Sequence, residues 1–209
     1  PIHWAARYNK TSLDTLDLLL DHKTFSIDWL NNLANKNNKV IPVRLVKGAY
    51  WDSEIKYAQV SGFDDYSVFT RKPLTDLSWM ACAIKLIKYQ KNIFPAFATH
   101  NAYSIAFIEE IARGCKFEFQ RIHGMADILH NYFNKNSNLE KTKCRIYAPV
   151  GDYEDLLPYL MRRLLENGAN TSFVNKLNDK NFKVEEFVID PIEIIKKYNE
   201  YRNPYIPKP

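Results

Sequence analysis

The sequence lacks the features that mark membrane-spanning and disulfide-stabilised proteins. It has no apolar run of about 18 residues, the length that a transmembrane helix needs, and the early stretch 16–20 is interrupted by Asp17. Only three cysteines occur, Cys82, Cys115 and Cys144, and they are widely separated. An odd number of isolated cysteines argues against a disulfide framework and favours a reducing compartment. We therefore expect a cytoplasmic protein.

Several catalytic and cofactor signatures are also missing. No strand-like run is followed by Gly-x-Gly-x-x-Gly, and no nucleophile elbow or Ser/His/Asp order is evident. His100 and His123 follow different strand-like runs, and neither has a cysteine or carboxylate at the spacing of a zinc site. The sequence therefore predicts no metal site and argues against a dinucleotide-binding Rossmann sheet.

Composition and charge are those of an ordinary globular protein. The 209 residues are 46% hydrophobic and 25% charged, with a formal net charge of +5 and a pI near 9.0. The lysines are dispersed among asparagines and form no stripe, so specific nucleic-acid binding is not expected. A substrate or cofactor carrying negative charge would account equally well for a locally basic pocket.

Strand-like and helix-like patterns alternate along the chain. Four short β-rich runs are each followed by a helical pattern, and this alternation favours an α/β fold with a parallel sheet. The strands are expected at 40–46, 93–99, 116–122 and 144–150, and the helices at 53–60, 75–90, 103–112, 125–134 and 153–167. A (β/α)8 barrel has eight such units over about 250 residues. The pattern predicts a partial TIM-type barrel.

The two ends of the chain read differently. Residues 1–40 contain helix-like stretches at 12–21 and 26–35 but no convincing strand. Near the other end, Asp190 can cap a short helix that begins at Pro191 and runs to about Tyr198. Pro204, Pro207 and Pro209 then indicate an extended terminus.

The helix-like stretch 156–170 contains two adjacent arginines, Arg162 and Arg163. A guanidinium is a natural receptor for a carboxylate or a phosphate. Glu166 lies within helical reach of both arginines, so a solvated basic face with an intrahelical ion pair is the alternative. Pro158 removes one backbone donor and risks a kink, and Asn167 with Gly168 predicts the end of the helix.

Other polar residues lie at or beside the predicted strand ends, where the catalytic residues of (β/α) barrels cluster. Arg44 alternates with apolar neighbours and is expected to point into the barrel, where a structural ion pair and a ligand role both remain open. Lys47-Gly48 and Thr70-Arg71-Lys72 could approach a phosphate, although solvated turns fit these segments too.

Six segments together resemble the proline dehydrogenase family, most closely the proline dehydrogenase module of bacterial bifunctional proline-utilization flavoproteins. They are Val43-Arg44-Leu45-Val46-Lys47-Gly48-Ala49-Tyr50-Trp51-Asp52, Val68-Phe69-Thr70-Arg71-Lys72-Pro73, Phe97-Ala98-Thr99-His100-Asn101, Phe117 to Gly124, Arg145 to Gly151, and Arg162 to Asn175. Their order over 43–175 makes chance similarity improbable.

The resemblance implies an FAD-dependent (β/α) barrel enzyme that oxidises L-proline to Δ1-pyrroline-5-carboxylate, the first step of proline degradation to glutamate. It implies a proline carboxylate held by Arg162 and Arg163, a proline ring flanked by Tyr50 and Tyr147, and an apolar wall from Ile122. Arg44 and Tyr147 would lie at the reacting centre. The residues implied to contact FAD are Arg44, Val46, Lys47, Gly48, Trp51, Thr70, Arg71, Lys72, Thr99, His100, Asn101, Glu166, Ser172 and Phe173.

The resemblance also sets expectations for organisation and partners. Residues 41–175 would be the C-terminal half of the barrel with its last helix, preceded by a helical lead at 1–40 and followed by an extension or linker at 176–209. The electron acceptor would be a membrane quinone, so the protein would be cytoplasmic or peripheral to the inner membrane. The chain is expected to be a fragment that pairs with a complementary chain or an aldehyde dehydrogenase domain. A catalytically silent remnant is the alternative.

Overall fold

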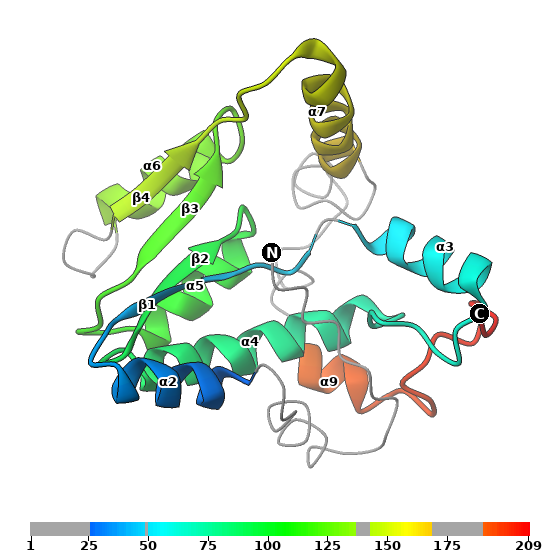
Figure 1. The fold of residues 1–209 in the computed structure, drawn as a ribbon, viewed down its shortest axis with the longest axis horizontal. Coiled ribbons are helices and arrows are strands. Elements are labelled where there is room, and N and C mark those ends of the chain that lie inside the picture. The colour runs from blue at the N-terminus through cyan, green and yellow to red at the C-terminus, as the bar shows by residue number, and fades with distance from the viewer. Residues whose placement is uncertain (1–25, 49, 137–142, 169–189) are drawn as a thin grey trace. The chain divides into compact units, whose positions relative to one another are not determined.

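The computed structural model describes residues 26–48, 50–136, 143–168 and 190–209. The chain divides into two compact units, residues 1–96 with 190–209, and residues 97–189. The four strands follow the order β1-β2-β3-β4 in the sheet (Figure 1). Strand β2 (Ile93–Ala98) crosses the boundary between the two units.

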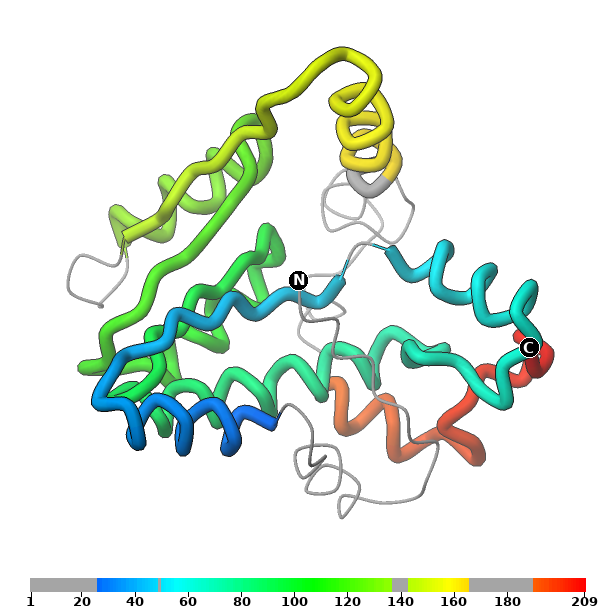
Figure 2. Tube along the Cα trace, in the orientation of Figure 1, coloured from blue at the N-terminus to red at the C-terminus, as the bar shows by residue number. Residues whose placement is uncertain are grey.

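The first unit is built around β1 and a long helix. Its described elements are α2 (Ile27–Lys36), β1 (Ile41–Leu45), α3 (Trp51–Ser61), α4 (Lys72–Lys88) and α9 (Pro191–Ile195). Helix α9 packs along α4 although the two are far apart in sequence, as the trace in Figure 2 shows. The expected helices at 53–60, 75–90 and 26–35 are confirmed.

Helix α4 forms the core of this unit because its apolar residues recur at helical spacing. Trp79, Ala83, Leu86 and Ile87 are buried along it. Helix α2 starts at Ser26, whose hydroxyl accepts a hydrogen bond from the Trp29 amide at 3.0 Å.

Polar contacts fix α2 beside α4. The carboxylate of Asp28 on α2 pairs with Lys85 on α4 and accepts a hydrogen bond from the hydroxyl of Tyr89. Asn92 donates to the side chain of Asn31 at 2.8 Å. These contacts make α2 part of the first unit.

The second unit contains α5 (Ala102–Ile111), β3 (Glu118–Ile122), α6 (Asp127–Asn136), β4 (Lys143–Tyr147) and α7 (Tyr153–Gly168). Strands β3 and β4 pair in parallel, and the last residue of each, Ile122 and Tyr147, are register partners. The carboxyl ends of these two strands therefore meet at one edge, as a β/α alternation predicts.

Aromatic rings fill the core of the second unit. Phe119 is fully buried, and its ring makes edge-on contacts with Phe117 at 5.3 Å, Phe133 at 5.2 Å and His130 at 5.7 Å between centroids. Such edge-to-face pairs are favoured by the ring quadrupole. Residues from β3 and α6 thereby lock the helix onto the strand.

The expected elements are largely confirmed, with differences in their bounds. The last helix ends at Ile195 and not near Tyr198. Strand β4 begins at Lys143 and ends at Tyr147, so the expected strand end at Val150 is wrong. Pro158 lies inside α7 without ending it, although an interior proline removes one internal hydrogen bond. The expected helix at 12–21 lies outside the described residues. Among the described residues, no helix is both long and apolar enough to span a membrane.

The aromatic core generates a stability prediction. Replacing Phe119 by alanine removes a fully buried ring, and we expect the free energy of unfolding to fall by about 3–5 kcal/mol. Urea denaturation of Phe119→Ala and wild type measures this loss. Tyr132→Ala on α6 is the matched control, because Tyr132 is 68% exposed. Equal losses in both variants would contradict the assignment of Phe119 to the core.

Candidate functional site

A cavity of about 530 Å³ lies within the first unit, lined by residues of α2, β1, α3 and α4 and of the segments between them. It is lined by all six of the predicted cofactor and substrate residues that precede residue 60. These are Arg44, Val46, Lys47, Gly48, Tyr50 and Trp51. The strand-end cluster expected from the sequence is therefore present in this unit.

Arg44 differs from expectation in its exposure. Strand β1 alternates as predicted, but Val43 and Leu45 are the partly buried residues and Arg44 is exposed. The expected burial of this guanidinium is thus wrong, while its inward direction stays a prediction. Arg44 lines the cavity and is exposed, and solvation lowers the cost of its charge.

The β1–α3 connection depends on a glycine. Gly48 has a φ of +96°, a conformation that residues with a Cβ rarely adopt. The turn leads into α3, where the indole Nε1 of Trp51 donates to the Phe69 carbonyl at 2.8 Å. This bond ties the start of α3 to the segment before α4 and fixes one wall of the cavity.

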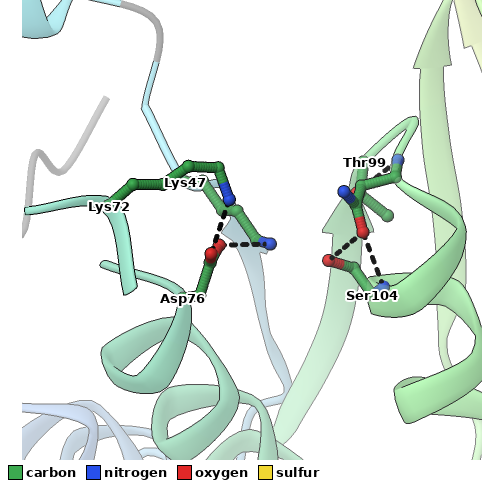
Figure 3. Close-up of polar contacts among 6 residues, drawn as sticks. Lys47, Lys72, Asp76, Thr99 and Ser104 are labelled. Carbon is green, nitrogen blue, oxygen red and sulfur yellow. Dashed lines mark hydrogen bonds and ion pairs between the residues drawn. The ribbon is translucent and has the colours of Figure 1, made fainter. Parts of the chain in front are cut away.

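Two lysines converge on Asp76, as Figure 3 shows. Lys47 follows β1 and lies 2.7 Å from one carboxylate oxygen, and Lys72, in the first turn of α4, lies 2.5 Å from the other. The Lys47 ammonium also lies 5.3 Å from the centre of the Trp79 ring. Lys47 is largely buried and Lys72 is exposed, so one cation lines the cavity and the other faces solvent.

Burial and charge act in opposite directions on this cluster. Burial lowers the pKa of the Lys47 ammonium, and Asp76 partly restores it. Burial alone would raise the pKa of the Asp76 carboxyl, but the two lysines hold that pKa below its usual value. The carboxylate therefore stays ionised and holds both cations in place.

The sequence reasoning missed Asp76. Its spacing of four residues from Lys72 on a helix was the available signal for an ion pair, but its contact with Lys47 spans 29 residues. The pattern of residues cannot reveal that second contact.

Thr70 and Arg71, predicted to bind phosphates, contact the end of the chain. The Thr70 hydroxyl accepts from the Asn203 amide at 2.9 Å. The Nε of Arg71 donates to the Arg202 carbonyl at 3.1 Å, and its guanidinium lies 4.0 Å from the centre of the Tyr198 ring.

In the second unit, Thr99, His100 and Asn101 form the turn between β2 and α5. Thr99 is buried, and its hydroxyl accepts from the Asn101 amide at 3.1 Å. Asn101 caps α5 by accepting from the amide and hydroxyl of Ser104 at 3.0 and 3.2 Å. Figure 3 shows Thr99 and Ser104 at this turn. His100 is exposed.

A buried histidine supports the same turn. His130 on α6 lies 3.0 Å from the Thr99 carbonyl through Nε2 and 3.6 Å from the Cys144 sulfur through Nδ1. A carbonyl only accepts, so Nε2 carries the proton. Burial lowers the pKa of His130 and favours this neutral form.

Two predicted substrate residues are neighbours in the sheet. Ile122 is buried at the end of β3, and Tyr147 is its register partner on β4. The Tyr147 carbonyl accepts from the His123 amide at 2.8 Å, which extends the pairing past the strand ends. The resemblance implies that these two residues contact the proline ring, and that role stays a prediction.

The arginine pair lies on α7, and both side chains are half-buried. The Arg163 guanidinium lies 4.6 Å from the centre of the Tyr159 ring, a stacking that orients its fork. Helix α7 ends at Gly168, as predicted. The predicted roles of the Glu166 side chain, Ser172 and Phe173 lie outside the described residues.

These groups can bind anions and planar rings. The first unit offers lysines and an indole at a cavity, and the second offers guanidinium groups and a phenol. Within the described ranges, no group of three or more His, Cys, Asp or Glu side chains could hold a metal ion.

Comparison with known proteins identifies the family to which this chain belongs. An α/β chain with a parallel sheet and basic strand ends matches the family model described as proline dehydrogenase over residues 8–176. The chain belongs to the proline dehydrogenase family, as the six segments indicated. It is 49% identical over 178 residues to the bifunctional protein PutA of Salmonella typhimurium and 34% identical over 139 residues to proline dehydrogenase 1 of Bacillus subtilis.

The relatives are much longer than this chain. The match covers 82% of this chain and 13% of the Salmonella protein, and 64% of this chain and 40% of the Bacillus protein. A solved structure of proline utilization A with proline bound in remote sites matches 87% of this chain and 19% of its own, at 48% identity and a TM-score of 0.79. The Bdellovibrio bacteriovorus protein inactivated by N-propargylglycine covers 96% of this chain and 20% of its own, at 30% identity and a TM-score of 0.71.

The lysine cluster generates a pH prediction. A carboxyl whose folded pKa is depressed stabilises the fold above its unfolded pKa, and that stability is lost as pH falls through the folded pKa. Asp76→Asn should therefore be less stable than wild type at neutral pH, and the difference should shrink below about pH 4. Urea denaturation across that range measures the difference.

Asp64→Asn is the matched control, because Asp64 is exposed and should give little pH-dependent difference. If the difference in unfolding free energy between Asp76→Asn and wild type stays the same in acid, the role of the Asp76 carboxylate is contradicted.

Proposed function

We propose that this chain supplies part of an FAD-dependent proline dehydrogenase that oxidises L-proline to Δ1-pyrroline-5-carboxylate. The observation that carries the proposal is the family match over residues 8–176. Every residue assigned to the cofactor or the substrate, from Arg44 to Phe173, falls inside that range.

The residues of the first unit fit a flavin nucleotide. Lys47 brings a positive charge to the cavity, Gly48 allows the backbone to approach a ligand closely, and Trp51 offers a ring. We propose that these residues, with Arg44, Val46, Thr70, Arg71 and Lys72, contact FAD. In the second unit we assign Thr99, His100, Asn101, Glu166, Ser172 and Phe173 to the same cofactor. A bound flavin supplies the hydride acceptor.

The protein's own groups bind and orient the substrate. We propose that Arg162 and Arg163 take the proline carboxylate, since a guanidinium fork matches a carboxylate with two parallel hydrogen bonds. Tyr50, Tyr147 and Ile122 would enclose the apolar ring. Fixing the ring by its carboxylate limits its orientations and lowers the entropic part of the barrier.

The architecture supports a barrel segment. Four strands alternate with helices in the described residues, whereas a complete (β/α) barrel has eight strands. We propose that residues 41–175 form the C-terminal half of such a barrel. The relatives named bifunctional PutA favour a covalently linked or complementary aldehyde dehydrogenase domain as partner, and we propose a membrane quinone as acceptor at the cytoplasmic face of the inner membrane.

Flavin retention tests the proposal. We expect this chain joined to the preceding barrel strands of the Salmonella PutA relative to bind FAD and to reduce a dye with proline. This chain alone should retain FAD more weakly, because open sheet edges leave the ligand exposed to water. Absorbance of the bound flavin and proline-dependent dye reduction are the measurements.

Two outcomes would contradict different parts of the proposal. Stoichiometric FAD and steady turnover from this chain alone would contradict the half-barrel proposal. A chimera without flavin would contradict the function itself and favour a catalytically silent remnant.

The carboxylate clamp predicts a specific kinetic defect. In an assembly that oxidises proline, Arg163→Met should raise the proline KM and leave flavin content unchanged. Loss of one bidentate contact should cost about 2–4 kcal/mol of substrate binding. Arg113→Met, an exposed arginine paired with Glu110 at 2.6 Å, is the control and should leave KM unchanged. An unaltered KM in Arg163→Met would remove the clamp assignment.

A further inference from the structure

The segment 198–207, termed the C-terminal strap, lies outside the family match that ends at residue 176. It follows α9, which packs on α4 in the first unit (Figure 1). The strap runs against the connection between α3 and α4, which carries Thr70 and Arg71. Figure 2 shows this C-terminal part of the trace beside that connection.

The strap is anchored by packing and by hydrogen bonds. Ile206 packs against the buried cluster of Ile55, Ala58 and Tyr66. The Tyr66 hydroxyl donates to the Pro207 carbonyl at 2.8 Å. These contacts hold the strap on α3 and on the segment that follows α3.

A second group of contacts fixes the predicted phosphate loop. The backbone amide of Asn203 donates to the Thr70 hydroxyl at 2.9 Å. Arg71 donates from Nε to the Arg202 carbonyl at 3.1 Å, and its guanidinium carbon lies 4.0 Å from the centre of the Tyr198 ring. The strap thus contacts Arg71 at its Nε and beside its guanidinium carbon.

The strap contacts only part of the Arg71 guanidinium. The hydrogen bond to the strap uses Nε, whereas a phosphate can be bound through the two terminal nitrogens of the guanidinium. The strap partners are a carbonyl and an aromatic ring, both uncharged, so they leave the full positive charge of Arg71 in place. A carboxylate partner would have neutralised it.

We propose that the C-terminal strap is a positioning element that holds Arg71 with its terminal nitrogens presented to the phosphates of a nucleotide ligand. Tyr198 is the positioning residue, because its ring lies beside the guanidinium carbon. The inference rests on the proposed function for the identity of the nucleotide as FAD. It assigns to residues outside the family match a part in binding the phosphate end of that ligand.

A matched pair of variants tests the role of Tyr198 in the full chain. Tyr198→Phe keeps the ring face, and Tyr198→Leu removes it. Calorimetry should give the leucine variant about fivefold weaker ADP affinity than the phenylalanine variant, with a smaller salt dependence. Adenosine, which lacks phosphates, should bind all forms alike. Hydrogen exchange of amides 65–72 should accelerate in the leucine variant alone.

Each outcome decides the inference. Equal ADP affinities in the two variants, or an equal loss for adenosine, would overturn it even if exchange and thermal stability changed. If Tyr198→Leu fails to fold, Arg71→Lys replaces it: lysine keeps the charge but lacks Nε and the planar fork, so the same weakening is expected, and undiminished affinity would overturn the strap's role. If the wild-type chain alone binds neither FAD nor ADP, the calorimetry is repeated on the chimera with the preceding barrel strands, and a chimera that binds neither would contradict the proposed function. In that case hydrogen exchange of amides 65–72 tests the positioning role of the strap. Equal exchange rates in Tyr198→Phe and Tyr198→Leu would overturn that role.

Discussion

The carboxylate of Asp76 is the constraint on which the ligand-facing part of the first unit depends. It binds Lys47 at the end of β1 and Lys72 at the start of α4, at 2.7 and 2.5 Å. Two ammonium groups brought together without an anion would repel each other and weaken the junction of strand and helix. Because one carboxylate serves both, the cluster keeps a net positive charge while each lysine has a fixed direction. Structural cohesion and anion attraction therefore come from the same three residues.

Most of the fold could be predicted from local patterns. Periodic apolar positions and caps such as Ser26, Asn101 and Asp190 define helices within a few residues of their observed bounds. Arg44 shows the limit of this reasoning. Its alternation with Val43 and Leu45 was read correctly, but alternation does not say which face of a strand the rest of the chain covers. That choice depends on α2 and α4, which no local pattern places.

The sequence predicted which residue types occur at the candidate site. It did not predict which residues contact and orient them. Cations after strand ends were visible as a pattern, whereas the contacts that orient them join residues far apart. Lys47 and Asp76 are 29 residues apart, and Thr70 and Asn203 are 133 apart. Contacts at such separations arise from tertiary packing, and a single sequence carries no periodic signal for them. The role of His130 under the Thr99 turn was missed for the same reason.

The cations of the first unit are held by two kinds of partner. A carboxylate holds Lys47, and uncharged groups hold Arg71. Lys47 is largely buried, so it needs a charged partner to offset the cost of desolvation. Arg71 keeps a delocalised charge that is more weakly hydrated, and a carbonyl and a ring suffice to hold it. Lys47 and Lys72 share one carboxylate, and Arg71 has none among these contacts, so the three cations together keep two positive charges for a bound anion. Had the strap offered an acid to Arg71, the loop would be held as firmly but would attract a phosphate less strongly.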